Sequence, residues 1–209
     1  MRHRSLAIAA LLVLASAAPL AAQIQPWQNQ WYWGAKGGLL RYTAASGSLN
    51  QVQVGGEWMI TARHTALYAA YSTTFTQTGV TYQITSATSV PVTFDAVQRI
   101  QVALLVLPWG GNIQPYAGGG FMIETLGNAN CATCSSLQTD TMLAHASGGF
   151  ALAMVGLQIR VGKLAVFGQA QFSPQGRGFV LLNSSSSFEA GVRYAFLGSR
   201  ESGDLSTER

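Results

Sequence analysis

The nine residues from 188 to 196 alternate between apolar and polar or small side chains without a fault. In an extended strand, successive side chains point to opposite faces, so this segment presents two distinct faces. Its apolar face would comprise Phe188, Ala190, Val192, Tyr194 and Phe196. Alternation alone does not distinguish a soluble sandwich from a membrane barrel, but aromatic residues that close a strand favour the girdle at a membrane interface. The segment therefore predicts a strand whose end suits a membrane surface.

Seven further segments show the same period of two. They span residues 31–42, 51–61, 65–75, 97–107, 113–125, 142–159 and 164–173. A tilted strand needs about 9–11 residues to cross a membrane, which these segments supply. In segment 142–159 the apolar parity changes near Val155 and Gly156, which predicts a β-bulge at that point. The pattern predicts an all-β fold, an eight-stranded antiparallel up-and-down transmembrane β-barrel.

The links between these segments alternate in length. Those at 62–64, 108–112 and 160–163 are short, whereas those at 43–50, 76–96, 126–141 and 174–187 are long. Outer-membrane barrels combine short periplasmic turns with long extracellular loops, whereas a soluble sandwich gives no reason for such alternation. Only 10% of the residues are charged, well under the roughly 25% of ordinary soluble domains. Both chain ends are therefore expected on the periplasmic side.

Residues 1–22 have the features of a secretory signal peptide. Arg2 and Arg4 precede a short apolar run, and small residues lead up to Gln23. The run falls short of the roughly 20 residues that a spanning helix needs, so an N-terminal membrane anchor is the weaker alternative. We therefore expect cleavage before Gln23, a barrel domain over residues 23–196 and a short disordered periplasmic tail over residues 197–209.

Six charged residues fall on the polar faces that would line the barrel interior. They are Lys36, Glu57, Arg99, Glu124, Glu189 and Arg193. An unpaired buried charge is very costly, so we expect these basic and acidic groups to form ion pairs. Hairpin symmetry predicts that Lys36 pairs with Glu57 and that Arg99 pairs with Glu124. On a soluble sheet, the alternative, the same residues would simply be solvated.

Three segments carry a resemblance to a known family. Residues 113–121 contain the pattern Pro-Tyr-x-Gly-x-Gly, and residues 33–39 have the composition of a first barrel strand. With the closing strand, they resemble the OmpA-like or opacity-protein-like superfamily of small outer-membrane β-barrels. The resemblance implies insertion among outer-membrane lipids of a diderm bacterium, with the help of periplasmic chaperones and the barrel assembly machinery.

The resemblance also implies that the assembly machinery reads the closing strand, in which Gly191, Tyr194 and Phe196 would form the signal. The chain departs from the family in one respect, because thirteen residues follow Phe196. The family signal often stands at the extreme C-terminus.

Two side-chain pairs could carry chemistry. Cys131 and Cys134 form a C-x-x-C pair. In an exported protein such a pair is more often a disulfide that stiffens a loop, and the alternatives are a redox centre and half of a zinc site. His145 and Ser147 lie two residues apart, and on a strand they would share the interior face. Lipid A deacylase barrels carry a His-x-Ser pair, but the residues that follow here do not match that family. We therefore expect no enzyme activity and no cofactor, with a lipid A-modifying barrel as a remote alternative.

The long link at 76–96 has strand-like alternation on both sides of a Ser-Ala-Thr-Ser tip. It predicts that the strands at 65–75 and 97–107 continue beyond the membrane as a β-hairpin, with Tyr82 paired to Val92 and with Tyr82 and Phe94 as candidate contacts for an outside partner. The basic residues are scattered, which argues against a nucleic-acid partner. The sequence favours a surface protein that acts through its loops in a structural, adhesive or ligand-contacting role. A narrow channel for small molecules is the alternative.

Overall fold

A computed structural model describes most of the chain beyond its N-terminal region. The described residues are 30–44, 47–85, 88–108, 111–174, 179–181 and 184–198. The predicted signal peptide lies outside them. So does the predicted tail, apart from its first two residues, which belong to the last strand.

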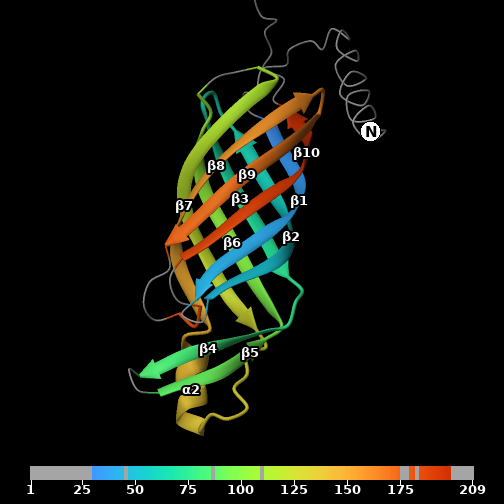
Figure 1. Cartoon of the computed structure of the whole chain (residues 1–209). Coiled ribbons are helices and arrows are strands. Elements are labelled where there is room, and N and C mark those ends of the chain that lie inside the picture. Colours follow the sequence, from blue (N-terminus) through green and yellow to red (C-terminus); the bar gives the residue numbers. More distant parts are fainter. Residues whose placement is uncertain are drawn as a thin grey trace, which may run out of the picture.

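Eight strands form a closed antiparallel barrel in the order β1-β10-β9-β8-β7-β6-β3-β2 (Figure 1). The barrel strands are β1 (Gln30–Ala44), β2 (Gly47–Thr61), β3 (Thr65–Thr74), β6 (Ala96–Val106), β7 (Ile113–Gly127), β8 (Ser147–Val161), β9 (Leu164–Pro174) and β10 (Ser184–Gly198). Each strand pairs with its sequence neighbours in the wall, and β1 pairs with β10 to close it. The predicted fold class is confirmed.

Alternating burial follows from the alternating sequence along the wall. On β6, the Leu104 side chain is 67% exposed on the outer surface, whereas that of Arg99 is 1% exposed inside. From Ile100 to Val106 the outer face of this strand is apolar, with Ile100, Val102, Leu104 and Val106, whereas the polar Gln98 is exposed on the same face nearer the cap end. Exposure of such a surface to water would be unfavourable, whereas the hydrocarbon core of a membrane is the environment that an apolar outer surface suits. Among the described residues, no helix is long and apolar enough to cross a membrane.

The two ends of the barrel differ. One end, the turn end, carries the β2–β3, β6–β7 and β8–β9 connections, the start of β1 and the end of β10. The β1–β2 connection lies at the other end but spans only residues 45 and 46, so the prediction of a long link at 43–50 is wrong. The other end, the cap end, carries the hairpin of β4 (Thr78–Thr85) and β5 (Thr88–Phe94) together with helix α2 (Ser136–Ala144) (Figure 1). We call the hairpin, residues 128–146 with helix α2, and residues 179–181 the cap.

The predicted hairpin is present, with two differences. Tyr82 pairs with Val90 rather than with Val92, because the turn pair Thr85–Thr88 is one residue tighter than the prediction assumed and the register shifts by one more residue between Gln83 and Thr85. The hairpin is also a separate two-stranded sheet rather than a continuation of β3 and β6, whose own ladder ends at Thr73 and Gln98.

Two predictions about segment 142–159 are wrong. Its first residues end helix α2, and the strand begins only at Ser147. The pairing of β8 with β7 also runs through Val155 and Gly156 without a shift, so there is no bulge. The apparent change of parity arises because Leu152 and Met154 point into the barrel, where they join an apolar layer of the interior.

Candidate functional site

Three ion pairs cross the interior of the barrel. Lys36 Nζ lies 2.8 Å from Glu189 Oε2, and Arg99 Nε lies 2.8 Å from Glu124 Oε1. The third pair joins Arg193 Nε to Glu57 Oε1. All six side chains are almost fully buried. The six candidate residues therefore do come together inside the barrel, and the predicted pair of Arg99 with Glu124 is present.

The prediction that Lys36 pairs with Glu57 is wrong, because the β1–β2 register differs by two residues from the predicted one. Lys36 lies opposite Gly55, and Glu57 lies opposite Gly34. On its other side, Gly34 pairs with Arg193 of β10. A Cβ atom at Gly34 would lie 2.9 Å from Glu57 Cγ, so the glycine provides the space in which Glu57 and Arg193 meet across β1. Large and small residues thus interdigitate along the inner face, a pattern that hairpin symmetry alone does not reveal.

Glu189 is the centre of a wider hydrogen-bond network. Besides Lys36, its carboxylate accepts hydrogen bonds from three amide side chains: Gln53 at 2.8 Å, Gln169 at 2.6 Å and Gln171 at 2.9 Å. Lys36 also donates to Tyr68 Oη and to Gln101 Oε1, each at 3.0 Å. Buried charges are tolerated when they are paired and hydrogen-bonded in this way.

The third pair is equally enclosed. The Arg193 guanidinium donates to Gln158 Oε1 at 2.7 Å and lies 3.8 Å from the centre of the Phe167 ring. Tyr68 Oη donates to Glu57 Oε2 at 3.1 Å. The largest fully buried side chains of the described residues include the two arginines of the ion pairs, Arg99 and Arg193. They also include four tyrosines of the barrel wall: Tyr32, Tyr42, Tyr68 and Tyr116. This part of the interior is therefore filled by packed side chains, as expected for eight strands.

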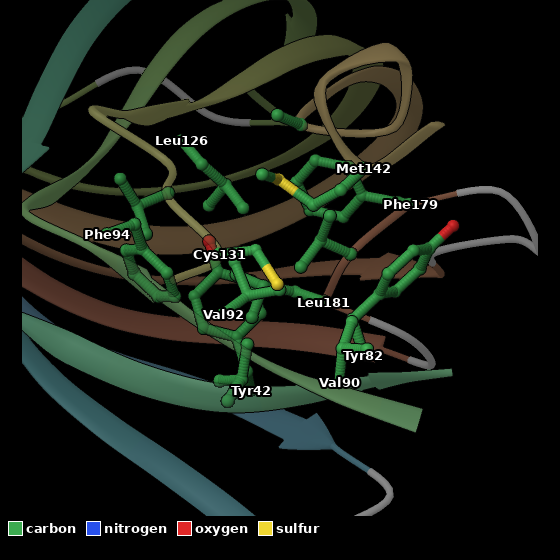
Figure 2. Packing of buried hydrophobic residues seen from close by; sticks show 14 of the residues in the cluster. Tyr42, Tyr82, Val90, Val92, Phe94, Leu126, Cys131, Met142, Phe179 and Leu181 are labelled. Atoms are coloured by element: carbon green, nitrogen blue, oxygen red, sulfur yellow. The ribbon is translucent and has the colours of Figure 1, made fainter. Parts of the chain in front are cut away.

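An apolar cluster covers the barrel interior at the cap end (Figure 2). The barrel wall contributes Leu40, Tyr42, Val97 and Leu126, and the cap contributes Val80, Tyr82, Val90, Val92, Phe94, Cys131, Met142, Phe179, Val180 and Leu181. The cluster packs the hairpin, the helix and residues 179–181 onto one another across the mouth.

The prediction that Tyr82 and Phe94 form an outer contact surface is wrong. Tyr82 is 5% exposed and Phe94 is 0% exposed, because the hairpin turns its apolar face toward this cluster. The opposite face of the hairpin, with Thr81, Ser89 and Thr93, is the exposed one. Sequence alternation distinguishes the two faces but does not say which of them is covered.

His145 joins three parts of the cap. It ends helix α2, its Nδ1 atom lies 2.6 Å from the Tyr82 hydroxyl, and its carbonyl accepts a hydrogen bond from the Val180 amide at 3.0 Å. Burial raises the pKa of the Tyr82 hydroxyl. The expectation that His145 and Ser147 share the interior face of a strand is therefore wrong, since His145 lies in the cap and Ser147 is exposed.

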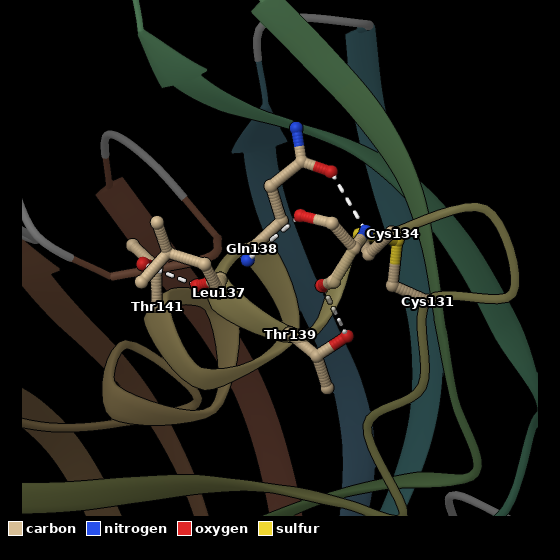
Figure 3. Close-up of a disulfide and its surroundings, with 7 residues drawn as sticks. Cys131, Cys134, Leu137, Gln138, Thr139 and Thr141 are labelled. Carbon is tan, nitrogen blue, oxygen red and sulfur yellow. Dashed lines mark hydrogen bonds between the residues drawn. A yellow bond between two sulfur atoms is a disulfide. The ribbon is translucent and has the colours of Figure 1, made fainter.

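A disulfide lies directly before helix α2 (Figure 3). Cys131 and Cys134 are bonded, and their Cα atoms lie 5.4 Å apart. Ser135 then caps the helix, since its side chain accepts from the Gln138 amide while the Gln138 side chain accepts from the Ser135 amide. The predicted disulfide is present. Among the described residues, no three His, Cys, Asp or Glu side chains are grouped so that they could hold a metal ion.

Aromatic side chains gather on the outer surface at the turn end. The ring centres of Trp31 and Trp58 lie 5.4 Å apart, and Phe196 lies 6.3 Å from Trp31 and from Trp33. Trp33 and Tyr194 are largely exposed on this outer face. Aromatic residues in this position are typical of the interfacial girdle of membrane barrels.

No protein-family model matches the chain, and no curated protein sequence matches it significantly. Solved structures do match. Neisserial surface protein A is 13% identical with a TM-score of 0.56, over 79% of this chain and 97% of that one. Ail, the attachment invasion locus protein of Yersinia pestis, is 10% identical with a TM-score of 0.50, over 81% of this chain and 99% of that one. The chain therefore shares the barrel fold of these two proteins.

Proposed function

We propose that this protein is a small bacterial outer-membrane barrel that acts through its cap, while the closed barrel serves as the anchor. The apolar outer surface supports the membrane location, since side chains such as Leu104, Phe121 and Phe188 are more than two-thirds exposed there. The aromatic cluster at the turn end supports the same location. The turn end would be periplasmic, together with both chain termini, and the cap would be extracellular.

The filled interior is the observation that carries the proposal. An aqueous channel would expose the side chains that line it, whereas Arg99, Gln101, Tyr68 and Arg193 are at most 1% exposed. Dissolved molecules would meet the ion-pair network and, beyond it, the apolar cluster beneath the cap. The narrow channel suggested as an alternative therefore gains no support from the described interior. The cap remains as the surface that can meet a partner in a structural, adhesive or ligand-contacting role.

The charges of the cap limit the chemistry of that partner. The Ail structure holds the heparin analogue sucrose octasulfate, a polyanion. Binding such a ligand takes clustered basic side chains. Among the described residues at the cap end, the exposed charged side chains are one arginine, Arg41, and two carboxylates, Asp95 and Asp140. The described cap therefore favours a partner without strong negative charge.

The closing strand supports the proposed assembly route. Tyr194 is exposed on the outer face of β10, and Phe196 packs beside Trp31 and Trp33 of β1. Gly191 pairs with Lys36 of β1 inside the barrel. We propose that Gly191, Tyr194 and Phe196 are the signal that the assembly machinery reads, after periplasmic chaperones have delivered the chain to the outer-membrane lipids.

Deletion of the hairpin tests the role of the cap. Residues 78–94 would be replaced by a short glycine linker, and folding would be checked by the migration of unheated protein in detergent gels. Attachment of expressing cells to a panel of immobilised proteins and glycans should be lost, while the barrel still folds. An epitope inserted after Asp140 should be labelled on intact cells, and one at the carboxyl terminus should not. Unchanged attachment after the deletion would contradict the proposal.

A further inference from the structure

We propose that β4 offers a free edge at which an uncharged, extended segment of a partner polypeptide adds as a third strand of the β4–β5 sheet. The inference rests on the function proposed above, because it names how the cap would take its partner. It is carried by the direction of the main-chain groups along the hairpin and by the chemistry of its two edges.

The direction of these groups follows from Thr93. Its main-chain N–H donates to the Asn130 carbonyl at 2.9 Å, and its carbonyl accepts from the Asn130 N–H at 2.8 Å. Both bonds lie on the side of β5 that faces away from β4. Thr93 pairs with Gly79, so the main-chain groups of Gly79 must also point away from the partner strand. Thr81 lies two residues further along and has the same direction.

The edge of β5 is closed. Asn130 occupies it at Thr93, and two residues earlier stands Pro91, which has no N–H to offer. Pro91 pairs with Thr81, so its ring nitrogen points away from β4 and costs the hairpin no hydrogen bond. Proteins protect sheet edges by several means, among them a loop that covers the edge and a proline within it.

At Gly79 and Thr81 the edge of β4 lacks such protection. Within the described part of the chain, no group hydrogen-bonds to the main chain of Gly79 or Thr81. The stretch from Thr78 to Gln83 contains no proline and no charged residue, and its pairing with β5 is regular. An extended main chain is the ligand whose alternating donors and acceptors match this edge.

The side chains indicate an uncharged partner. Residues 76–94 include no Asp, Glu, Lys, Arg or His, so the hairpin can contribute no ion pair to a partner strand. Gly79 and Thr81 are exposed, whereas Val80 and Tyr82 face the cap. Affinity would therefore come from main-chain hydrogen bonds. A third strand would also stabilise the hairpin, since two-stranded sheets are marginal by themselves.

The test uses the full-length protein in detergent micelles and a synthetic eight-residue peptide of alternating threonine and valine with blocked ends. The amide resonances of Gly79 and Thr81 should shift, and their hydrogen exchange should slow. Thr81→Pro removes one outward N–H and should weaken binding about ten-fold, the usual effect of one lost hydrogen bond. Thr81→Ala keeps the N–H and should bind as the wild type does. A peptide that is N-methylated at successive residues should not bind the wild type, which tests the idea even if Thr81→Pro fails to fold.

The opposite results would overturn the proposal. These are no peptide binding, equal binding by Thr81→Pro and wild type, or equal binding of the N-methylated peptide. Self-association of the wild type that Thr81→Pro abolishes would assign the edge to a second copy and would also overturn it. If cell attachment is lost on hairpin deletion but survives Thr81→Pro, strand addition is wrong while the proposed function of the cap stands.

Discussion

Replacing Glu189 with glutamine should destabilise the barrel by about 3–5 kcal/mol, the usual cost of leaving a buried charge without its partner. Glutamine keeps the shape of the side chain but removes the charge that faces Lys36, whose ammonium group is buried 2.8 Å away. The remaining acceptors of Lys36, Tyr68 and Gln101, are uncharged. One of the amide groups that donate to the carboxylate would also lose its acceptor.

A double variant isolates the charge effect. Adding Lys36→Met to Glu189→Gln removes both charges while the side-chain volumes stay similar. Replacing both members of a buried ion pair in this way often changes the free energy of unfolding little. The double variant should therefore recover most of the lost free energy of unfolding. Asp140→Asn, at an exposed position of α2, is the matched control and should change stability by less than about 0.5 kcal/mol.

The assay is reversible urea unfolding from lipid vesicles, followed by tryptophan fluorescence. If the free energy of unfolding falls with urea concentration at the same slope in all variants, they expose the same surface area on unfolding. A cost below about 1 kcal/mol for Glu189→Gln, or a double variant no more stable than that single one, would refute the idea that this ion pair organises the interior.

Further predictions concern the wall, the loop and the cap. Leu104→Arg places a charge on the outer surface and should cost about 2–4 kcal/mol in a folding titration, whereas Leu104→Ala should cost far less. In the same titration, Gly34→Ala should destabilise the folded barrel by at least about 1 kcal/mol, because the added methyl group would contact Glu57. Gly149→Ala, where the added methyl group has open space around it, should leave the stability nearly unchanged. Thiol labelling without reductant should find Cys131 and Cys134 blocked, and replacing both by serine should barely change barrel stability because the closed loop is short. Tyr82 should ionise above its ordinary pKa of about 10 in a spectrophotometric titration compared with Tyr82→Phe. Its burial contributes stability that is present below pH 10 and is lost as the pH rises through the folded-state pKa.

Much of the wall could be predicted from the sequence because parity is a local property. Leu104 outside and Arg99 inside follow directly from a period of two. Register could not be obtained in the same way, since it depends on how tightly each turn closes. The predicted β1–β2 register is two residues away from the observed one, and in the observed register Glu57 pairs with Arg193 instead of Lys36.

The cap was predicted less well for a different reason. Tyr82 and Phe94 were correctly placed on one face of a hairpin, but their burial depends on long-range packing against Met142 and Leu181, which no local pattern encodes. Helix α2 was missed, although Ser135 and Gln138 have the spacing of a capping box, a signal that was present in the sequence.

Single-channel recording in planar bilayers tests the central claim most directly, because a filled and capped barrel should not conduct. The wild type should show no steady open level of porin size, and Glu189→Gln should behave in the same way wherever it remains folded. Deletion of residues 78–94 removes the hairpin but leaves the three ion pairs, so it should not open a steady conductance either. A steady open level of porin size in the wild type would contradict the account.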